Sequence, residues 1–464
     1  MEYQKIPVEL QSNWTTDNNG FPLLDSEVER YLSVRPSASQ LRQAERPFYA
    51  FFHFGMNTAT GREWGSGKEI AADFTIREID AAQWVSAVKS AGATGVILTC
   101  KHHDGFCLWD TAATDFSVMH SPCGRDIVRQ VSGACDAAGL DFGVYLSPWD
   151  MHESTYGAPA YSDFFCRQLT ELLTGYGNIF EVWFDGAKGE TAKEFAYDWD
   201  RYYKLIRKLQ PAANIAVCGP DLRWVGNEAG KTRAAEFSVV PEALTRAETV
   251  QKNSQHRAED GEAMKEITSS DEDLGSRRVL ERSEKLCWYP AEVDVSIRRG
   301  WFYHREEDST VKSADTLFSI YLNSVGNNCT LLLNIPPNRE GKLCEKDVQV
   351  LQELGRKIRS VTQDPILEAA PGRLTERQGA LTFPFPAPER LRYCVLEEDI
   401  AESQRVEAFT LYLRLPSGKL QEAVSGTVIG SKKIIPLNVE ATGAVLVIRQ
   451  SRSTPVLKKV GFYR

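Results

Sequence analysis

The hexapeptide Glu181-Val182-Trp183-Phe184-Asp185-Gly186 is the segment from which the fold can be worked out. The apolar and aromatic run between Asn178 and Gly186 is too short for a helix, and its neighbours have helical patterns. The run is therefore predicted to be a buried parallel strand. It would carry Asp185 at its C-terminal end, where α/β barrels place their chemistry. An Asp at this position can also simply cap the next helix, and this segment alone does not decide between the two interpretations.

Strands and helices alternate on both sides of this segment. Apolar runs predict further strands at 48–55, 95–100, 142–147 and 214–219. Amphipathic stretches predict helices between them, for example at 80–91 and 126–138. Such alternation implies parallel strands joined by right-handed crossovers. No glycine-rich phosphate loop follows the first strand, which argues against a nucleotide-binding sheet.

Residues capable of chemistry recur at the ends of successive predicted strands. They are His53, His102, His103, Tyr145 and Asp185. A barrel and an open doubly wound sheet both fit the alternation, but the strand ends of a barrel all converge on one mouth. The recurrence therefore favours an α/β fold with a (β/α)8-like, TIM-type catalytic barrel.

The length of 464 residues exceeds what one core usually accommodates. We expect an irregular lead-in at 1–46, the barrel at 47–362 and a β-sandwich at 363–464, where short β-rich runs replace long helices. Two of these runs contain Pro384 and Pro436. Proline cannot donate to a sheet ladder, so both runs are expected to be edge strands at best.

Composition excludes several classes of function. The net charge is −9 with no basic run, which argues against nucleic-acid binding. No apolar stretch approaches the length of a membrane span. Met1 to Lys5 does not begin a signal peptide, so the sequence as it stands predicts a cytoplasmic protein, or a periplasmic or secreted one if a signal was removed. The ten cysteines form no C-x-x-C pair and are expected to be buried free thiols.

His102-His103-Asp104 contains side chains that can ligate a metal ion. Adjacent side chains in an extended segment point in opposite directions, and no His-x-x-x-His pair is present. We therefore expect neither metal nor cofactor, and hence activity that survives EDTA. The strand-end residues instead suit a polyhydroxylated ligand: imidazoles bind hydroxyls, aromatic faces cover a sugar ring, and two carboxyl groups are what glycoside hydrolysis requires.

Several stretches together resemble the α-L-fucosidases of glycoside hydrolase family 29. Each is weak alone, but in this order they are highly specific, and they span most of residues 48–340. The matching stretches are 53–58 (HFGMNT), 62–65 (REWG), 101–106 (KHHDGF), 181–186 (EVWFDG), 300–304 (GWFYH) and 331–337 (LLLNIPP).

The resemblance implies a retaining double displacement with Asp185 as the nucleophile. The segment 224–230 (WVGNEAG) resembles the branch selective for α-1,3 and α-1,4 linkages, subfamily B, in which Glu228 would be the acid/base. Glu236, eight residues further on, is the competing candidate. Trp301 would face the C5 methyl group of fucose. The other residues that the resemblance places at the sugar are His53, Glu63, Trp64, His102, His103, Tyr145 and Trp183.

The function expected from these observations is release of terminal L-fucose from Lewis-type glycans, with a fucosylated oligosaccharide or glycoconjugate as the partner. Two alternatives remain open. One is a glycosidase of the same fold acting on a related sugar such as a galactoside. The other is a catalytically silent sugar-binding protein, against which the presence of both Asp185 and Glu228 argues. The oligomeric state cannot be predicted from the sequence.

Overall fold

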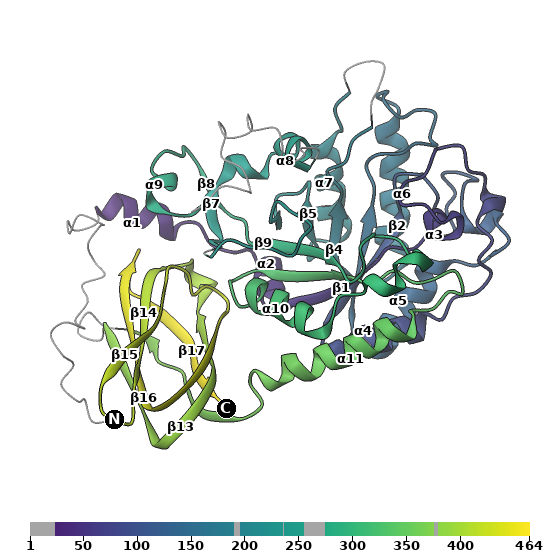
Figure 1. Ribbon diagram of the computed structural model, residues 1–464. Coiled ribbons are helices and arrows are strands. Elements are labelled where there is room, and N and C mark those ends of the chain that lie inside the picture. The colour runs from purple at the N-terminus through teal and green to yellow at the C-terminus, as the bar shows by residue number, and fades with distance from the viewer. Residues whose placement is uncertain (1–23, 190–194, 235, 255–273, 375–378) are drawn as a thin grey trace.

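A computed structural model describes residues 24–189, 195–234, 236–254, 274–374 and 379–464 (Figure 1). Its central element is an eight-stranded sheet in the order β5-β4-β3-β2-β1-β10-β9-β6, in which every neighbouring pair is parallel. The strands are β1 (Phe48–Phe52), β2 (Gly95–Lys101), β3 (Asp141–Leu146), β4 (Ile179–Phe184), β5 (Asn214–Val217), β6 (Arg223–Trp224), β9 (Ala291–Ser296) and β10 (Thr330–Asn334). A parallel bridge from Ala216 to Leu222 links the two ends, so the sheet is a nearly closed barrel, as predicted.

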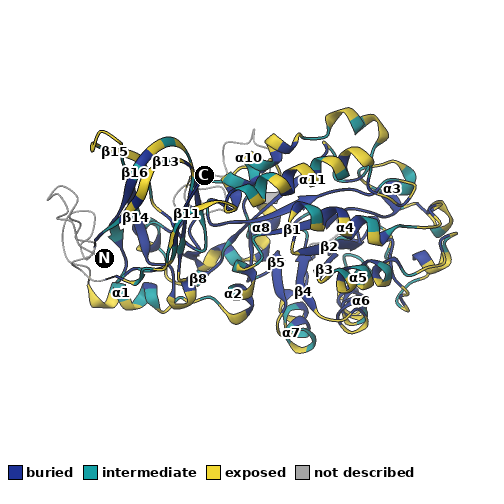
Figure 2. Cartoon of the chain, turned by 90° about the horizontal axis from the view of Figure 1, so that it is seen from below, coloured by how far each residue is buried: buried dark blue, intermediate teal, exposed yellow. Residues whose placement is uncertain are grey.

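Helices cover the outside of the barrel and expose one side to solvent (Figure 2). The main ones are α4 (Ala81–Ala91), α5 (Ile127–Ala138), α6 (Tyr161–Gly175), α7 (Trp199–Leu209), α10 (Ala314–Ser324) and α11 (Glu345–Ser360). The predicted helix ends are confirmed by their caps: Asp80 and Asp126 accept hydrogen bonds from backbone N–H groups three residues on. Gly92 and Gly139 adopt the left-handed conformation that ends α4 and α5.

Shorter elements lie between these units. They are α3 (Met56–Thr60), α8 (Ala247–Ser254), α9 (Arg277–Leu280) and the antiparallel pair β7 (Val239–Pro241) and β8 (Leu286–Trp288). All ten cysteines are free thiols, and most are buried, as expected.

The lead-in was predicted to be irregular, and this is wrong for its described part. Residues 25–44 form α1 (Asp25–Leu32) and α2 (Ala38–Ala44), and Ser37 caps α2 by accepting from the backbone N–H of Gln40. The sequence pattern is misleading because the buried face of α2 is polar. Gln40 donates to the carbonyls of Asp221 and Trp288, so hydrogen bonds from polar side chains help to hold this face.

The C-terminal part is an antiparallel sheet in the order β11-β17-β13-β16-β14-β15, which folds around its own hydrophobic core (Figure 1). Its strands are β11 (Pro365–Ala369), β12 (Gly372–Arg373), β13 (Ala380–Glu398), β14 (Val406–Arg414), β15 (Leu420–Gly426), β16 (Lys433–Ser451) and β17 (Val456–Tyr463). Helix α11 ends at Ser360 and β11 begins at Pro365. The division that we place at residues 362 and 363 therefore stays a prediction consistent with this change of architecture.

The two proline-containing runs were expected at sheet edges, but β13 and β16 are internal strands. Each is 19 residues long and contains two of the predicted runs. Proline has no backbone N–H to donate, and both strands place it where only one neighbouring strand is paired. β13 pairs with β17 only over 393–398 and β16 pairs with β14 only over 443–451. Pro384 and Pro436 therefore lie in stretches that have one ladder partner rather than two.

Candidate active site

A cavity of about 440 Å³ opens at the carboxyl ends of the barrel strands. Its size suits a small ligand such as a monosaccharide. Parallel strands explain its position, because their C-terminal ends meet at one mouth of the barrel. Most of the predicted site residues line it, namely His53, Trp64, His102, His103, Trp183, Asp185, Glu228 and Trp301.

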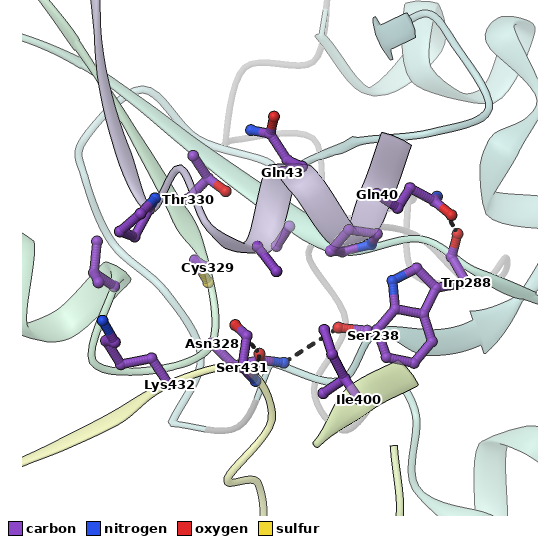
Figure 3. Close-up of a pocket in the computed structure, with 15 residues that line it drawn as sticks. Gln40, Gln43, Ser238, Trp288, Asn328, Cys329, Thr330, Ile400, Ser431 and Lys432 are labelled. Atoms are coloured by element: carbon purple, nitrogen blue, oxygen red, sulfur yellow. Dashed lines mark hydrogen bonds between the residues drawn. The ribbon is translucent and has the colours of Figure 1, made fainter. Parts of the chain in front are cut away.

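A very small cavity lies at the N-terminal end of β10, between α2 and the C-terminal part of the chain (Figure 3). Gln40, Trp288, Asn328 and Ser431 are among its walls. Its volume of about 20 Å³ holds roughly one water molecule and no sugar. The indole N–H of Trp288 is buried without a protein partner, which makes a bridging water chemically suitable there.

Asp185 follows β4 directly and projects into the large cavity. Tyr145 donates its hydroxyl hydrogen to Asp185 Oδ2 at 3.0 Å, and the backbone N–H of Ala187 donates to Oδ1 at 2.7 Å. His103 Nε2 lies 3.9 Å from Oδ2. Both carboxylate oxygens therefore have a donor, and the side chain keeps 24% of its surface exposed.

Two of the histidines present hydrogen-bond acceptors to the cavity. His53 Nδ1 lies 2.9 Å from the amide oxygen of Asn334, which can only accept, so Nδ1 carries the proton and Nε2 the lone pair. His103 Nδ1 lies 2.7 Å from Ser147 Oγ, whose own hydrogen is donated to the carbonyl of Trp149. Nδ1 of His103 is therefore protonated too, and its Nε2 accepts.

The third histidine has the opposite tautomer. The amide nitrogen of Asn57 lies 3.4 Å from His102 Nδ1 and donates to it, which leaves the proton on Nε2. Burial keeps all three rings uncharged: it lowers the pKa of His53 to about 3 and lowers the pKa values of His102 and His103 as well. The cavity thus offers two neutral acceptors and one neutral donor, a pattern suited to sugar hydroxyls.

Glu228 lies on the loop after β6, at the rim of the same cavity. The indole N–H of Trp301 donates to its Oε2 at 3.3 Å. Although the side chain is exposed to the cavity, the surrounding protein reduces its hydration, and this raises its pKa. The negative charge of Asp185 adds to the increase.

Glu236, the competing candidate, is buried away from the residues that line the cavity. Arg223 donates to its Oε2 at 2.9 Å, and Arg233 donates to its Oε1 at 2.7 Å. Burial alone would raise the pKa of Glu236, but the two guanidinium groups lower it below its usual value. Its carboxylate is thus held ionised in a structural ion-pair cluster.

Two predicted site residues stand behind the cavity wall rather than in it. Tyr145 acts through its bond to Asp185. Glu63 accepts the backbone N–H groups of Trp301 and Phe302 and contacts the ring of His304 at 2.8 Å. Both carboxylate oxygens of Glu63 are therefore used to hold the segment that carries Trp301, and its predicted contact with the sugar stays a prediction.

One ionisable cavity residue was not predicted from the sequence. Asp294 on β9 is 3% exposed and lines the cavity, where the indole N–H of Trp224 donates to its Oδ1 at 2.7 Å. Burial, and then the charge of Glu228, raises its pKa well above the usual range. A signal was present: β9 alternates apolar residues with Glu292, Asp294 and Ser296, which is the pattern of a barrel strand with a polar inner face.

Among the described residues, no group of three or more His, Cys, Asp or Glu side chains is arranged to hold a metal ion. In the same residues, no helix is both long and apolar enough to cross a bilayer.

Comparison with known proteins gives a consistent result. The family model described as alpha-L-fucosidase matches residues 52–360. The chain is 37% identical to Alpha-L-fucosidase 1 of Arabidopsis thaliana, over 92% of this chain and 87% of the plant protein.

Solved structures agree with the sequence matches. A glycoside hydrolase 29 family member from an unknown rumen bacterium has a TM-score of 0.79 at 36% identity, covering 93% of this chain and 77% of that one. A Ruminococcus gnavus GH29 fucosidase in complex with fucose has a TM-score of 0.79 at 27% identity, covering 93% and 95% of the two chains. With the barrel and its acidic, histidine-lined cavity, these matches show that the chain is an α-L-fucosidase of glycoside hydrolase family 29.

Proposed function

We propose that this α-L-fucosidase is a retaining exo-enzyme that releases terminal L-fucose from α-1,3- and α-1,4-linked, Lewis-type glycans. The observation that carries the proposal is the pairing of two carboxyl groups with different environments in one cavity. Asp185 is held by two hydrogen bonds at the end of β4, whereas Glu228 lies at the rim and has a raised pKa. Such a difference is what separates a nucleophile from an acid/base in glycoside hydrolysis.

In the first step, an oxygen of Asp185 attacks C1 of fucose as the bond from C1 to the leaving oxygen breaks. Glu228 gives its proton to that oxygen, and a β-fucosyl ester of Asp185 forms. In the second step, Glu228 takes a proton from water, the water oxygen attacks C1, and Asp185 departs. The product is α-L-fucose. The ester removes the charge of Asp185, which lowers the pKa of Glu228 when it must act as a base.

The three imidazoles support a role in binding the sugar. Neutral rings can exchange hydrogen bonds with hydroxyls without the cost of burying a charge. His53 and His103 would accept, and His102 would donate. The indole of Trp301 lies 5.0 Å from the His53 ring, between centroids, and presents an apolar surface to the same space. A C5 methyl group would pack on such a surface.

The linkage preference is tested by comparing two natural substrates. The rim segment 224–230 supports a binding site for a branch sugar, whose contacts can lower the transition-state energy. We expect kcat/KM for a Lewis-type trisaccharide to exceed that for an α-1,2-linked trisaccharide by at least about tenfold, or ~1.4 kcal/mol. Equal values would exclude the branch assignment while leaving fucosidase activity intact. An aryl glycoside panel separates the remaining candidates: a galactosidase would prefer the galactoside, and a binding protein would turn over nothing.

The hydrogen bond from Trp301 gives a pH prediction. The indole N–H stabilises the ionised form of Glu228 and lowers its pKa, so Trp301→Phe should raise that pKa. Because kcat/KM requires protonated Glu228 in the free enzyme, the alkaline limb of its pH profile should move to higher pH. Trp64→Phe is the matched control, since Trp64 lines the same cavity and is 54% exposed at its rim. If the alkaline limb of the pH profile moves equally in both variants, or in neither, Glu228 is not the acid/base.

A further inference from the structure

The interior of the barrel below the cavity contains a cluster of polar side chains. Tyr49 on β1, Glu181 on β4 and Glu292 on β9 are at most 1% exposed. The interior of a TIM-type barrel is normally filled by branched apolar side chains. Two carboxyl groups there cost stability unless hydrogen bonds or protonation compensate.

The hydrogen bonds within this cluster form one connected chain. Tyr49 Oη lies 3.0 Å from Glu181 Oε2 and makes a short hydrogen bond with Glu292 Oε2. Gln43 donates to Tyr49 Oη at 3.0 Å. The indole N–H of Trp183 donates to Glu292 Oε1 at 2.7 Å. Both oxygens of Glu292 are therefore used, whereas Oε1 of Glu181 is buried without a partner.

The number of available hydrogens determines which of Tyr49, Glu181 and Glu292 act as hydrogen-bond donors. Tyr49 has one hydroxyl hydrogen but contacts two carboxyl groups, so one of these groups must itself carry a proton. Glu292 faces the N–H of Trp183 and is best suited to accept on both oxygens as a carboxylate. Glu181 has an unpartnered buried oxygen, which is far less costly for a neutral acid than for a carboxylate. The balanced arrangement has Glu181 protonated and donating toward Tyr49 and Glu292, while Tyr49 and Trp183 donate to Glu292.

Electrostatics agrees with this assignment. Burial, and then the proximity of Glu292, raises the pKa of Glu181 well above its usual value. Burial raises the pKa of Glu292 too, while the hydrogen bonds from Tyr49, Trp183 and Glu181 oppose that increase. The other charged or titratable groups nearby are Arg46, whose charge acts on Glu181, and Asp294, which feels the charge of Glu292.

This chain ends at the reacting group. Trp183 lines the cavity, and its ring stacks on Tyr145 with centroids 5.4 Å apart and planes 22° apart. Tyr145 in turn donates to Asp185. The orientation of one indole therefore affects both the wall of the sugar site and the partner of the nucleophile.

We propose that Glu181, Tyr49 and Glu292 form a proton-sharing relay that fixes the indole of Trp183, which makes Glu292 a positioning residue for fucoside hydrolysis. The effect on hydrolysis rests on the proposed function, but the relay itself does not. A misplacement near 1 Å at a reacting site can cost about 10²-fold in rate, so the relay is expected to matter for turnover.

The test uses the full chain with three variants. Glu292→Leu removes both acceptors and should lower kcat/KM on an aryl α-L-fucoside by about 10–100-fold. Glu292→Gln restores one neutral acceptor and should recover part of that loss. Glu181→Gln is neutral and can donate to Tyr49, as the protonated acid does, so its kcat/KM should stay within about threefold of wild type. Val293→Ala is the control for general destabilisation, because Val293 is a buried apolar neighbour on the same strand.

A second readout follows Trp183 directly. In ¹⁵N-indole spectra, with Trp183→Phe to assign the resonance, the N–H signal of Trp183 should shift in Glu292→Leu. It should remain in place in Glu181→Gln and Val293→Ala. Wild-type activity together with an unshifted signal in Glu292→Leu would overturn the positioning role. Damage in Glu181→Gln equal to that in Glu292→Leu would overturn the proton assignment.

Two further outcomes are distinguishable. If Glu292→Leu does not fold, Glu292→Gln decides: replacing a charged acceptor by a neutral one weakens the bond, so the Trp183 signal must move. An unmoved signal there would exclude the relay. If wild-type protein cleaves no α-L-fucoside, the proposed function fails, while the spectra still test the relay.

Discussion

Asp185→Gly is expected to fold normally and to lose about 10⁴-fold or more of its kcat on aryl α-L-fucosides. Without this carboxylate no covalent intermediate forms, and no other group in the cavity can replace it. Added azide can occupy the space of the missing side chain and attack C1 from the same face. The expected product is β-fucosyl azide, identified by NMR.

Folding of Asp185→Gly is checked by its melting temperature. The side chain is partly exposed, and among the described residues its hydrogen bonds come from Tyr145 and Ala187, so little stability depends on it. Substantial residual turnover of the variant without azide, or an α-fucosyl azide product, would require another nucleophile.

Glu228→Ala should have a different signature. On natural glycans, whose leaving oxygen needs a proton, kcat/KM should fall by about 10²–10⁴-fold. Nitrophenyl fucosides have good leaving groups and should still form the intermediate, which then accumulates because no base activates water. Azide intercepting that intermediate should restore turnover and give α-fucosyl azide, the anomer opposite to that from Asp185→Gly.

Glu236→Ala is the control for Glu228→Ala. It leaves Arg223 and Arg233 without their buried carboxylate and should cost stability, typically about 3–5 kcal/mol for a broken buried pair. Azide should not rescue any loss of activity it causes. Rescue of Glu236→Ala, without rescue of Glu228→Ala, would exchange the two roles.

The barrel could be predicted from sequence because its signals are local. Apolar strands end in polar residues, and Asp or Gly marks helix ends such as Asp80 and Gly92. The features that were missed depend on tertiary contacts. Helix α2 buries polar residues such as Gln43, so its pattern resembles a loop. Strands β13 and β16 run through proline positions because those stretches need only one ladder partner.

In the site, too, local signals could be predicted from the sequence and tertiary contacts could not. Residues at predicted strand ends, such as His53 and Asp185, lie together in the cavity because parallel strands bring their ends together. Their partners were missed: Asn334 sets the tautomer of His53, yet lies far away in sequence. The resemblance of segment 224–230 favours Glu228 over Glu236, but only the fold shows how their surroundings differ. Glu228 faces the cavity, whereas Glu236 faces two arginines.

The proposed retaining mechanism requires a covalent bond between fucose and Asp185. A 2-deoxy-2-fluoro-fucosyl inactivator with a good leaving group tests this directly, because fluorine slows both steps and the leaving group speeds only the first. Mass spectrometry of the digested protein should find one fluorofucosyl group on the peptide that contains Asp185. A label on the peptide carrying Glu228 or Glu236 would contradict the assignment of the nucleophile.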